Sequence, residues 1–130
     1  MTTHASGTFD VKLTPQADDN PAGRLLIEKT FHGDLVATSQ GQMLAIRTGI
    51  ENSAGYVAME KVTGKLHGRE GSFALQHSGS MNRGARSLSV SVVPDSGAGE
   101  LVGLAGTMDI QITDGKHFYT FDYAIERGEP

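Results

Sequence analysis

Hydrophobic and polar residues alternate along most of this chain with a period of two, the pattern that is typical of half-buried β-strands. Residues 6–13 predict the first strand, with Phe9, Val11 and Leu13 on one face. The polar segment that follows, residues 15–23, contains two prolines and predicts the longest connection of the chain. We expect this segment to lie over one mouth of the sheet structure and to act as a lid.

Two further strands are predicted before the middle of the chain. Residues 24–38 form a long one, in which Gly33 is interpreted as a bulge or bend point. Its odd positions are the more apolar set, and Lys29 lies among them. Lys29 is therefore either an interior charge or a sign that the strand twists, and such a lysine more often extends to the surface. Residues 42–50 form the next strand, with Arg47 on one face and, on the other, Leu44, Ile46 and Ile50.

Residues 54–81 predict a long β-hairpin around which the rest of the chain is organised. Gly68 can adopt the positive φ that a tight turn requires, so a two-residue loop at Gly68 and Arg69 is expected. This register pairs residues of one face: Tyr56 with Met81, Ala58 with Gly79, Glu60 with His77, Val62 with Leu75, and Gly64 with Phe73. The face is apolar except at one pair, so we expect Glu60 and His77 to point inward, directly opposite each other.

A second hairpin is predicted at the end of the chain, where Asp114 and Gly115 form a preferred type I′ turn pair. Its register pairs Gly106 with Tyr123, Met108 with Phe121, Ile110 with Tyr119, and Ile112 with His117. Between the hairpins, residues 87–93 predict a strand. The glycine-rich segment 95–106 predicts a bend, because it lacks the lysine and the spacing of phosphate-binding loops. Eight strands and no helix predict an all-β fold, a single closed antiparallel barrel.

Composition narrows the classes of function. A length of 130 residues predicts one domain, residues 1–130. The absence of cysteine excludes disulfides, thiolate metal sites and a catalytic thiol. A formal net charge of −4, with acidic and basic residues interspersed, argues against nucleic acid as a partner. No apolar run is long enough to cross a bilayer and the first residues show no leader pattern, so we expect a cytoplasmic protein with no membrane partner.

Three segments resemble a family of small bacterial proteins of unknown function that is grouped with the allene oxide cyclase-like barrels. They read YVAMEKVTGKLHGREGSFALQHSGSM, VVPDSGAGELVGLAGTM and HFYTFDYAI, from residues 56, 92 and 117. The resemblance implies an eight-stranded antiparallel barrel with a central cavity. Proteins of that architecture, such as plant allene oxide cyclases, dirigent proteins and bacterial spirocyclases, shape a reactive small molecule inside the barrel without a cofactor. No catalytic residue of the cyclases maps onto this chain by motif.

Glu60 and His77 are the candidate catalytic residues. A carboxylate beside an imidazole in a cavity can hold and return a proton near neutral pH, although a buried pair can also serve only to fix strand register. The candidate ligand-binding residues are the inward aromatic residues Tyr56, Phe73, Tyr119, Phe121 and Tyr123, and inward tyrosines more often fill a barrel and bind the backbone. A metal site built from His77, His117 and Glu60 has no supporting spacing, so neither a metal nor a cofactor is expected.

Two classes of function follow from these residues. The first is an enclosed site for a small apolar or carbonyl-bearing molecule, as in a cofactor-independent cyclase or isomerase. The second is a non-catalytic carrier, or a structural or interaction module with a filled barrel. In either case we expect a homo-oligomer, with a dimer favoured, because Val57, Met59 and Phe118 are large outward residues that would form one exposed patch.

Overall fold

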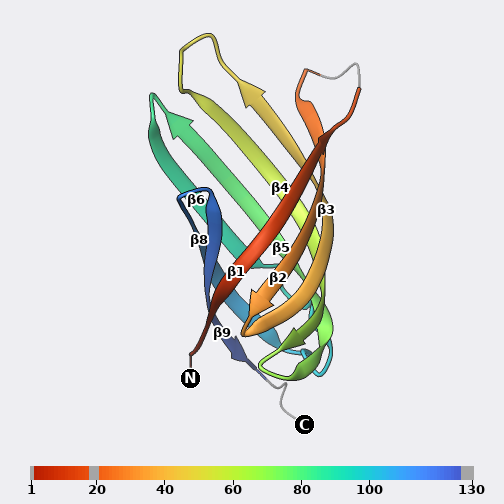
Figure 1. Cartoon of the computed structure of the whole chain (residues 1–130). Helices are drawn as coiled ribbons and strands as arrows, with labels where there is room; N and C mark the ends of the chain where they lie inside the picture. The colour runs from red at the N-terminus through yellow and green to blue at the C-terminus, as the bar shows by residue number, and fades with distance from the viewer. Residues whose placement is uncertain (1, 18–20, 127–130) are drawn as a thin grey trace.

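The computed structural model describes residues 2–17 and 21–126. These residues form nine β-strands and no helix. In chain order the strands are β1 (Thr3–Pro15), β2 (Gly23–Gly33), β3 (Leu35–Arg47), β4 (Ala54–Leu66), β5 (Arg69–Asn82), β6 (Ala85–Val92), β7 (Ala98–Gly99), β8 (Leu104–Thr113) and β9 (Lys116–Ile125). Eight of them close an antiparallel ring in the order β1-β2-β3-β4-β5-β6-β8-β9 (Figure 1). The short β7 pairs with β5 outside the ring. The predicted closed eight-stranded barrel is confirmed.

The barrel has two unlike ends. The β3–β4 and β5–β6 turns lie at the end drawn uppermost in Figure 1, and the β2–β3 and β4–β5 turns lie at the other end. We call these the open end and the closed end. The expected lid, residues 15–23, connects β1 to β2 at the open end, and its residues 18–20 lie outside the described residues.

Aromatic and aliphatic side chains fill the closed half of the barrel. The rings of Phe73 and Phe121 stack with their centroids 5.8 Å apart, and Phe121 stacks in turn on Tyr123 at 5.3 Å. Leu35 and Leu66 beside them are fully buried. This half is a packed core, so any space for a ligand has to lie nearer the open end.

The β8–β9 hairpin confirms its sequence prediction in full. Asp114 and Gly115 form the turn with φ of 52° and 77°, the two positive angles that a type I′ turn requires. All four predicted pairs are present, from Gly106 with Tyr123 to Ile112 with His117.

The β4–β5 hairpin turns one residue earlier than predicted. The turn residues are His67 and Gly68, with φ of 47° and 79°. Glu60 therefore pairs with Leu75, and His77 pairs with Ala58, so the expected direct Glu60–His77 pair is wrong. Moving the turn by one residue shifts every pair by two positions, which leaves each side chain on its predicted face. Both residues still point inward, as diagonal neighbours.

The predicted strand over residues 24–38 is wrong, because the chain reverses at Gly33 and Asp34. Gly33 has a φ of 101°, which favours glycine, and it ends β2 rather than bending a longer strand. Gly41 in turn lies inside β3, opposite Glu60. The sequence shows two glycines in this region, and only the fold reveals which of them is the turn.

The reversal also decides which face of β3 points inward. Leu44 and Ile46 face outward with exposed fractions of 43% and 52%. Met43, Ala45 and Arg47 are on the inner face, since they belong to the rows of buried or half-buried residues that continue across β4. The apolar set predicted for residues 42–50 is therefore an outer surface, and Arg47 belongs to the lumen.

Candidate functional site

A buried group of four polar side chains crosses the middle of the barrel. Glu60 on β4 accepts hydrogen bonds at one carboxylate oxygen, Oε2, from Lys29 Nζ at 2.8 Å and from His77 Nε2 at 2.6 Å. Its other oxygen, Oε1, accepts a hydrogen bond from the Ser39 hydroxyl at 2.8 Å. The side chains of Lys29, Glu60 and His77 are 6%, 0% and 4% exposed. The carboxylate accepts hydrogen bonds from three other strands.

The strands around this group are built to hold it. Gly41 faces Glu60 directly, so the carboxylate meets no opposing side chain. Lys29 and Ser39 are direct partners on the β2–β3 ladder, which brings both donors to the same place. The ammonium of Lys29 lies 4.9 Å from the centroid of the Phe9 ring and 5.8 Å from that of Phe31, close enough for cation–π attraction.

Glu60 is ionised at all but strongly acidic pH. Burial by itself would raise the pKa of this carboxyl group, but the hydrogen bonds from His77 and Lys29 and the charge of Lys29 outweigh burial and lower the pKa to about 2. A group with this pKa accepts hydrogen bonds and does not hold a proton near neutral pH. The carboxylate therefore orients His77 through Nε2–H, and any proton exchange falls to the imidazole.

A pocket of about 420 Å³ lies between this buried group and the open end. All eight strands of the ring contribute to its lining, which is mostly apolar. His77 and Lys29 form its floor, and Glu60 lies behind them. The volume is within the range of small-molecule sites in proteins.

His77 presents a ring nitrogen without a protein partner. Its Nε2 is bound to Glu60, whereas Nδ1 makes no hydrogen bond to any described residue. Among the described residues, no fully buried side-chain nitrogen or oxygen lacks a hydrogen-bond partner, so Nδ1 is not fully buried, and the open space beside His77 is the pocket. With Nε2–H held by Glu60, a neutral His77 directs the lone pair of Nδ1 toward the pocket.

Tyr56 adds a hydroxyl group to the pocket wall. Its ring lies across Gly79, where a Cβ would be 2.3 Å from the ring, so the glycine makes room for it. Burial, together with the charge of Glu60, raises the pKa of Tyr56 above its usual 10. The phenol stays protonated and can donate a hydrogen bond.

Apolar side chains surround the opening of the pocket. Leu13, Leu88 and Ile112 face the lumen but are 45%, 40% and 53% exposed. Leu88 on β6 and Ile112 on β8 border the weakest seam of the barrel, where Ser91 and Thr107 are the one pair that joins β6 to β8 in the described ladder. Large apolar side chains left uncovered around an opening are typical of a ligand entrance.

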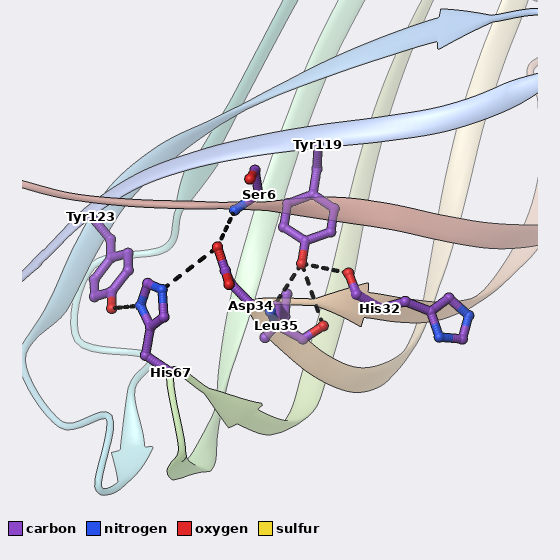
Figure 2. Close-up of polar contacts among 7 residues, drawn as sticks. All are labelled: Ser6, His32, Asp34, Leu35, His67, Tyr119 and Tyr123. Atoms are coloured by element: carbon purple, nitrogen blue, oxygen red, sulfur yellow. Dashed lines mark hydrogen bonds and ion pairs between the residues drawn. The ribbon is translucent and has the colours of Figure 1, made fainter.

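The other predicted ligand-binding residues lie away from the pocket. Phe73, Phe121 and Tyr123 belong to the packed closed half, and none of them lines the pocket. Tyr119, which is 1% exposed, donates a hydrogen bond to His32 O at 2.8 Å and accepts one from Leu35 N at 2.9 Å (Figure 2). Of the five aromatic residues predicted to bind a ligand, the geometry places Tyr56 alone at the pocket.

Figure 2 also shows the polar contacts that hold the turns of the closed end. Asp34 in the β2–β3 turn accepts a hydrogen bond from Ser6 N at 2.9 Å and lies 3.6 Å from His67 Nε2. His67 in the β4–β5 turn bonds through Nδ1 to the hydroxyl of Tyr123 on β9. This chain of contacts ties two turns to the far wall of the barrel.

Sequence reasoning missed part of the site. It favoured a surface position for Lys29, whereas the lysine is 7% exposed, and it gave no role to Ser39. The signal for Lys29 was its place in the apolar row of β2, because a charge in such a row requires a buried counter-charge. Among the described residues, no group of three or more His, Asp or Glu side chains is arranged to hold a metal ion.

The fold and the pocket define a class of protein, a small closed β-barrel with a lumen pocket that is open at one end. A model of the family described as a protein of unknown function, DUF3224, matches residues 5–123. The chain belongs to the DUF3224 family.

A solved structure agrees with this assignment. The crystal structure of a protein with unknown function from the DUF3224 family of Shewanella oneidensis is 50% identical to this chain, with a TM-score of 0.93. The match covers 98% of this chain and 100% of that one. No curated protein matches the chain. The expected grouping with the allene oxide cyclase-like barrels stays a prediction. Among the described residues, no helix is long and apolar enough to span a membrane.

Proposed function

We propose that this barrel binds a small, mostly apolar molecule in the lumen pocket, and that His77 exchanges a proton with a carbonyl-bearing ligand there. The reaction class is a cofactor-independent isomerisation or cyclisation. The observation that carries the proposal is the arrangement of His77, whose Nε2 is fixed on Glu60 while Nδ1 meets the pocket without a protein partner. Glu60 is a positioning residue in this scheme, and His77 is the catalytic one.

The apolar lining supports the binding step. Removing apolar surface from water contributes roughly 25 cal/mol per Å² to the free energy of binding. The pocket supplies such a surface together with a few polar groups at its floor and wall, which is the usual composition of a small-molecule site. The hydroxyl of Tyr56 and the ammonium of Lys29 are donors that can polarise a carbonyl oxygen next to the imidazole.

Binding is tested with N-phenyl-1-naphthylamine, a neutral fluorescent probe. Ala45→Phe fills the lumen, and Leu44→Phe adds bulk to the outer face one residue away, so the second variant is a matched control. We expect at least a tenfold loss of probe affinity in Ala45→Phe and less than a twofold change in Leu44→Phe. Equal affinities in both variants would contradict a lumen site.

Proton exchange is tested with 2-decanone in D₂O, by following the α-proton signals with NMR. His77→Gln keeps an amide nitrogen for Glu60 and removes the free ring nitrogen, and His32→Gln is a control at an exposed histidine. We expect exchange above the buffer rate in the wild type and in His32→Gln, and loss of that excess in His77→Gln. Probe binding with no excess exchange would leave a carrier, the non-catalytic alternative.

A further inference from the structure

The charged residues of the pocket all have one sign. Arg47, Arg86 and Lys29 line it together with His77 and His117, and the described lining residues include no aspartate or glutamate. The whole chain is acidic, with 15 Asp and Glu against 11 Lys and Arg. A pocket with basic groups only, in a protein of negative net charge, is complementary to an anion.

Arg47 and Arg86 belong to one row across the wall of the pocket. Arg47 pairs with Ala54, Ala54 pairs with Met81, and Met81 pairs with Arg86, so all four residues lie in one row of the ladder on the inner face. Three interstrand steps separate the two arginine Cα atoms by roughly 14 Å along the wall, a gap that two arginine side chains can close from its ends. Neither guanidinium has an ion pair or hydrogen bond to a described residue.

The ladder also gives the distance along the strands between this row and His77. His77 is level with Met43 on β3, through Ala58, and Arg47 lies four positions further along that strand. Four positions correspond to about 13 Å of strand. Tyr56, level with Ala45, lies midway between the two rows.

The floor is a poor place for the anion. Lys29 is already neutralised by Glu60 at 2.8 Å, and a negative group placed there would face the Glu60 carboxylate across a medium of low dielectric constant. The arginines at the rim have no such competitor among the residues that line the pocket. An acidic group therefore fits the rim, and an apolar body fits the space below it.

We propose that the ligand is an amphipathic anion, held by Arg47 and Arg86 through one acidic group and extending an apolar body of about 13 Å toward His77. The inference rests on the proposed function, since it names the ligand class of the same pocket. It assigns two residues, Arg47 and Arg86, to ligand recognition, and it fixes the direction in which the ligand lies.

The test compares two probes that share one aromatic body. 1-Anilinonaphthalene-8-sulfonate carries an acidic group, and N-phenyl-1-naphthylamine does not. We expect Arg47→Gln combined with Arg86→Gln to weaken sulfonate binding at least tenfold and to change amine binding less than twofold. Arg69→Gln combined with Arg83→Gln gives the same change of net charge outside the pocket and should leave both affinities unchanged.

The outcomes separate this inference from the proposed function. If Ala45→Phe abolishes the binding of both probes but the Arg47 and Arg86 substitutions do not affect the sulfonate, the pocket stands and the anion assignment falls. If Ala45→Phe affects neither probe, the proposed function itself fails. In a series of alkane-1-sulfonates, affinity should rise up to decane-1-sulfonate and then level off, and a continued rise to hexadecane-1-sulfonate would overturn the assigned length of the apolar body.

Discussion

Gly41 lies directly opposite Glu60 on the β3–β4 ladder, and its missing side chain is what makes room for the buried carboxylate. A Cβ at position 41 would lie 2.0 Å from the carbonyl oxygen of Met59 and 2.8 Å from the Cβ of Glu60. The polar group that carries the proposed function thus depends on a residue that makes no hydrogen bond to it.

Substitution Gly41→Ala should lower the free energy of unfolding by about 1–3 kcal/mol, because the added carbon forces the two strands or the Glu60 side chain to move. Urea unfolding followed by circular dichroism measures the change. The control is Gly23→Ala on β2, where a Cβ would make an ordinary contact at 3.7 Å from Ala45 O. Equal stability of the two variants would show that position 41 is not constrained.

Substitution Glu60→Gln should cost about 3–5 kcal/mol of stability, since it leaves the buried ammonium of Lys29 without its counter-charge. Glu28→Gln, at the exposed neighbour of Lys29, should have little effect. Adding Lys29→Met to Glu60→Gln removes the uncompensated charge and should restore part of the loss. A double variant less stable than Glu60→Gln alone would argue against a mutual dependence of the two charges.

The free energy of unfolding should fall at acidic pH, because Glu60 becomes protonated there. Its pKa is lowered from 4.5 to about 2 by folding, so the ionised form favours the folded state. The contribution is fully present above about pH 5 and is lost as the pH falls toward 2; the shift corresponds to about 3 kcal/mol. Unfolding in urea at several pH values should show the stability gap between wild type and Glu60→Gln shrinking with acidity. A gap that stays constant would contradict the lowered pKa.

The hydroxyl groups of Tyr119 and Tyr123, at the closed end, should contribute unequally to the free energy of unfolding. Tyr119→Phe leaves the buried Leu35 N–H without an acceptor and should cost about 1–3 kcal/mol. Tyr123→Phe loses a bond to His67, whose side chain is 35% exposed and can bind water instead, so the loss should be below about 1 kcal/mol. Thermal unfolding of both variants provides the comparison, and a larger loss for Tyr123→Phe would reverse the assignment.

Self-association remains a prediction, but the surface expected to mediate it no longer includes Phe118. Val57 and Met59 on β4 are 52% and 49% exposed, and Val57 pairs with the outward Leu44 on β3. Phe118 lies on β9, which β1, β2 and β3 separate from β4, so it does not join the patch that was predicted to include it. We expect a dimer through the β3–β4 surface, because a two-fold contact uses one patch twice and closes.

Replacing Val57 and Met59 by lysine should shift the protein toward monomer, whereas Phe118→Lys should not. Light scattering at tens of micromolar, roughly where a micromolar interface would be filled, measures the mass. A monomeric wild type at that concentration would refute the dimer.

The sequence by itself determined the fold class and the inward direction of the polar pair. Alternation shows which residues of a strand share a face, and this grouping survives any register error of two positions, which is why Glu60 and His77 were placed inside although their direct pairing was wrong. The Asp114-Gly115 turn was predicted to the residue because both turn positions require positive φ and their sequence is strongly preferred there.

Only the tertiary structure decided what the interior contains. Gly33 and Gly41 are both glycines between apolar runs, and long-range pairing makes the first a turn and the second a space for Glu60. The same pairing turned Arg47 into the lumen and buried Lys29 against a carboxylate from another strand. Contacts of this kind join residues that are far apart in the chain, and local propensity does not encode them, because their energy arises only when the barrel closes.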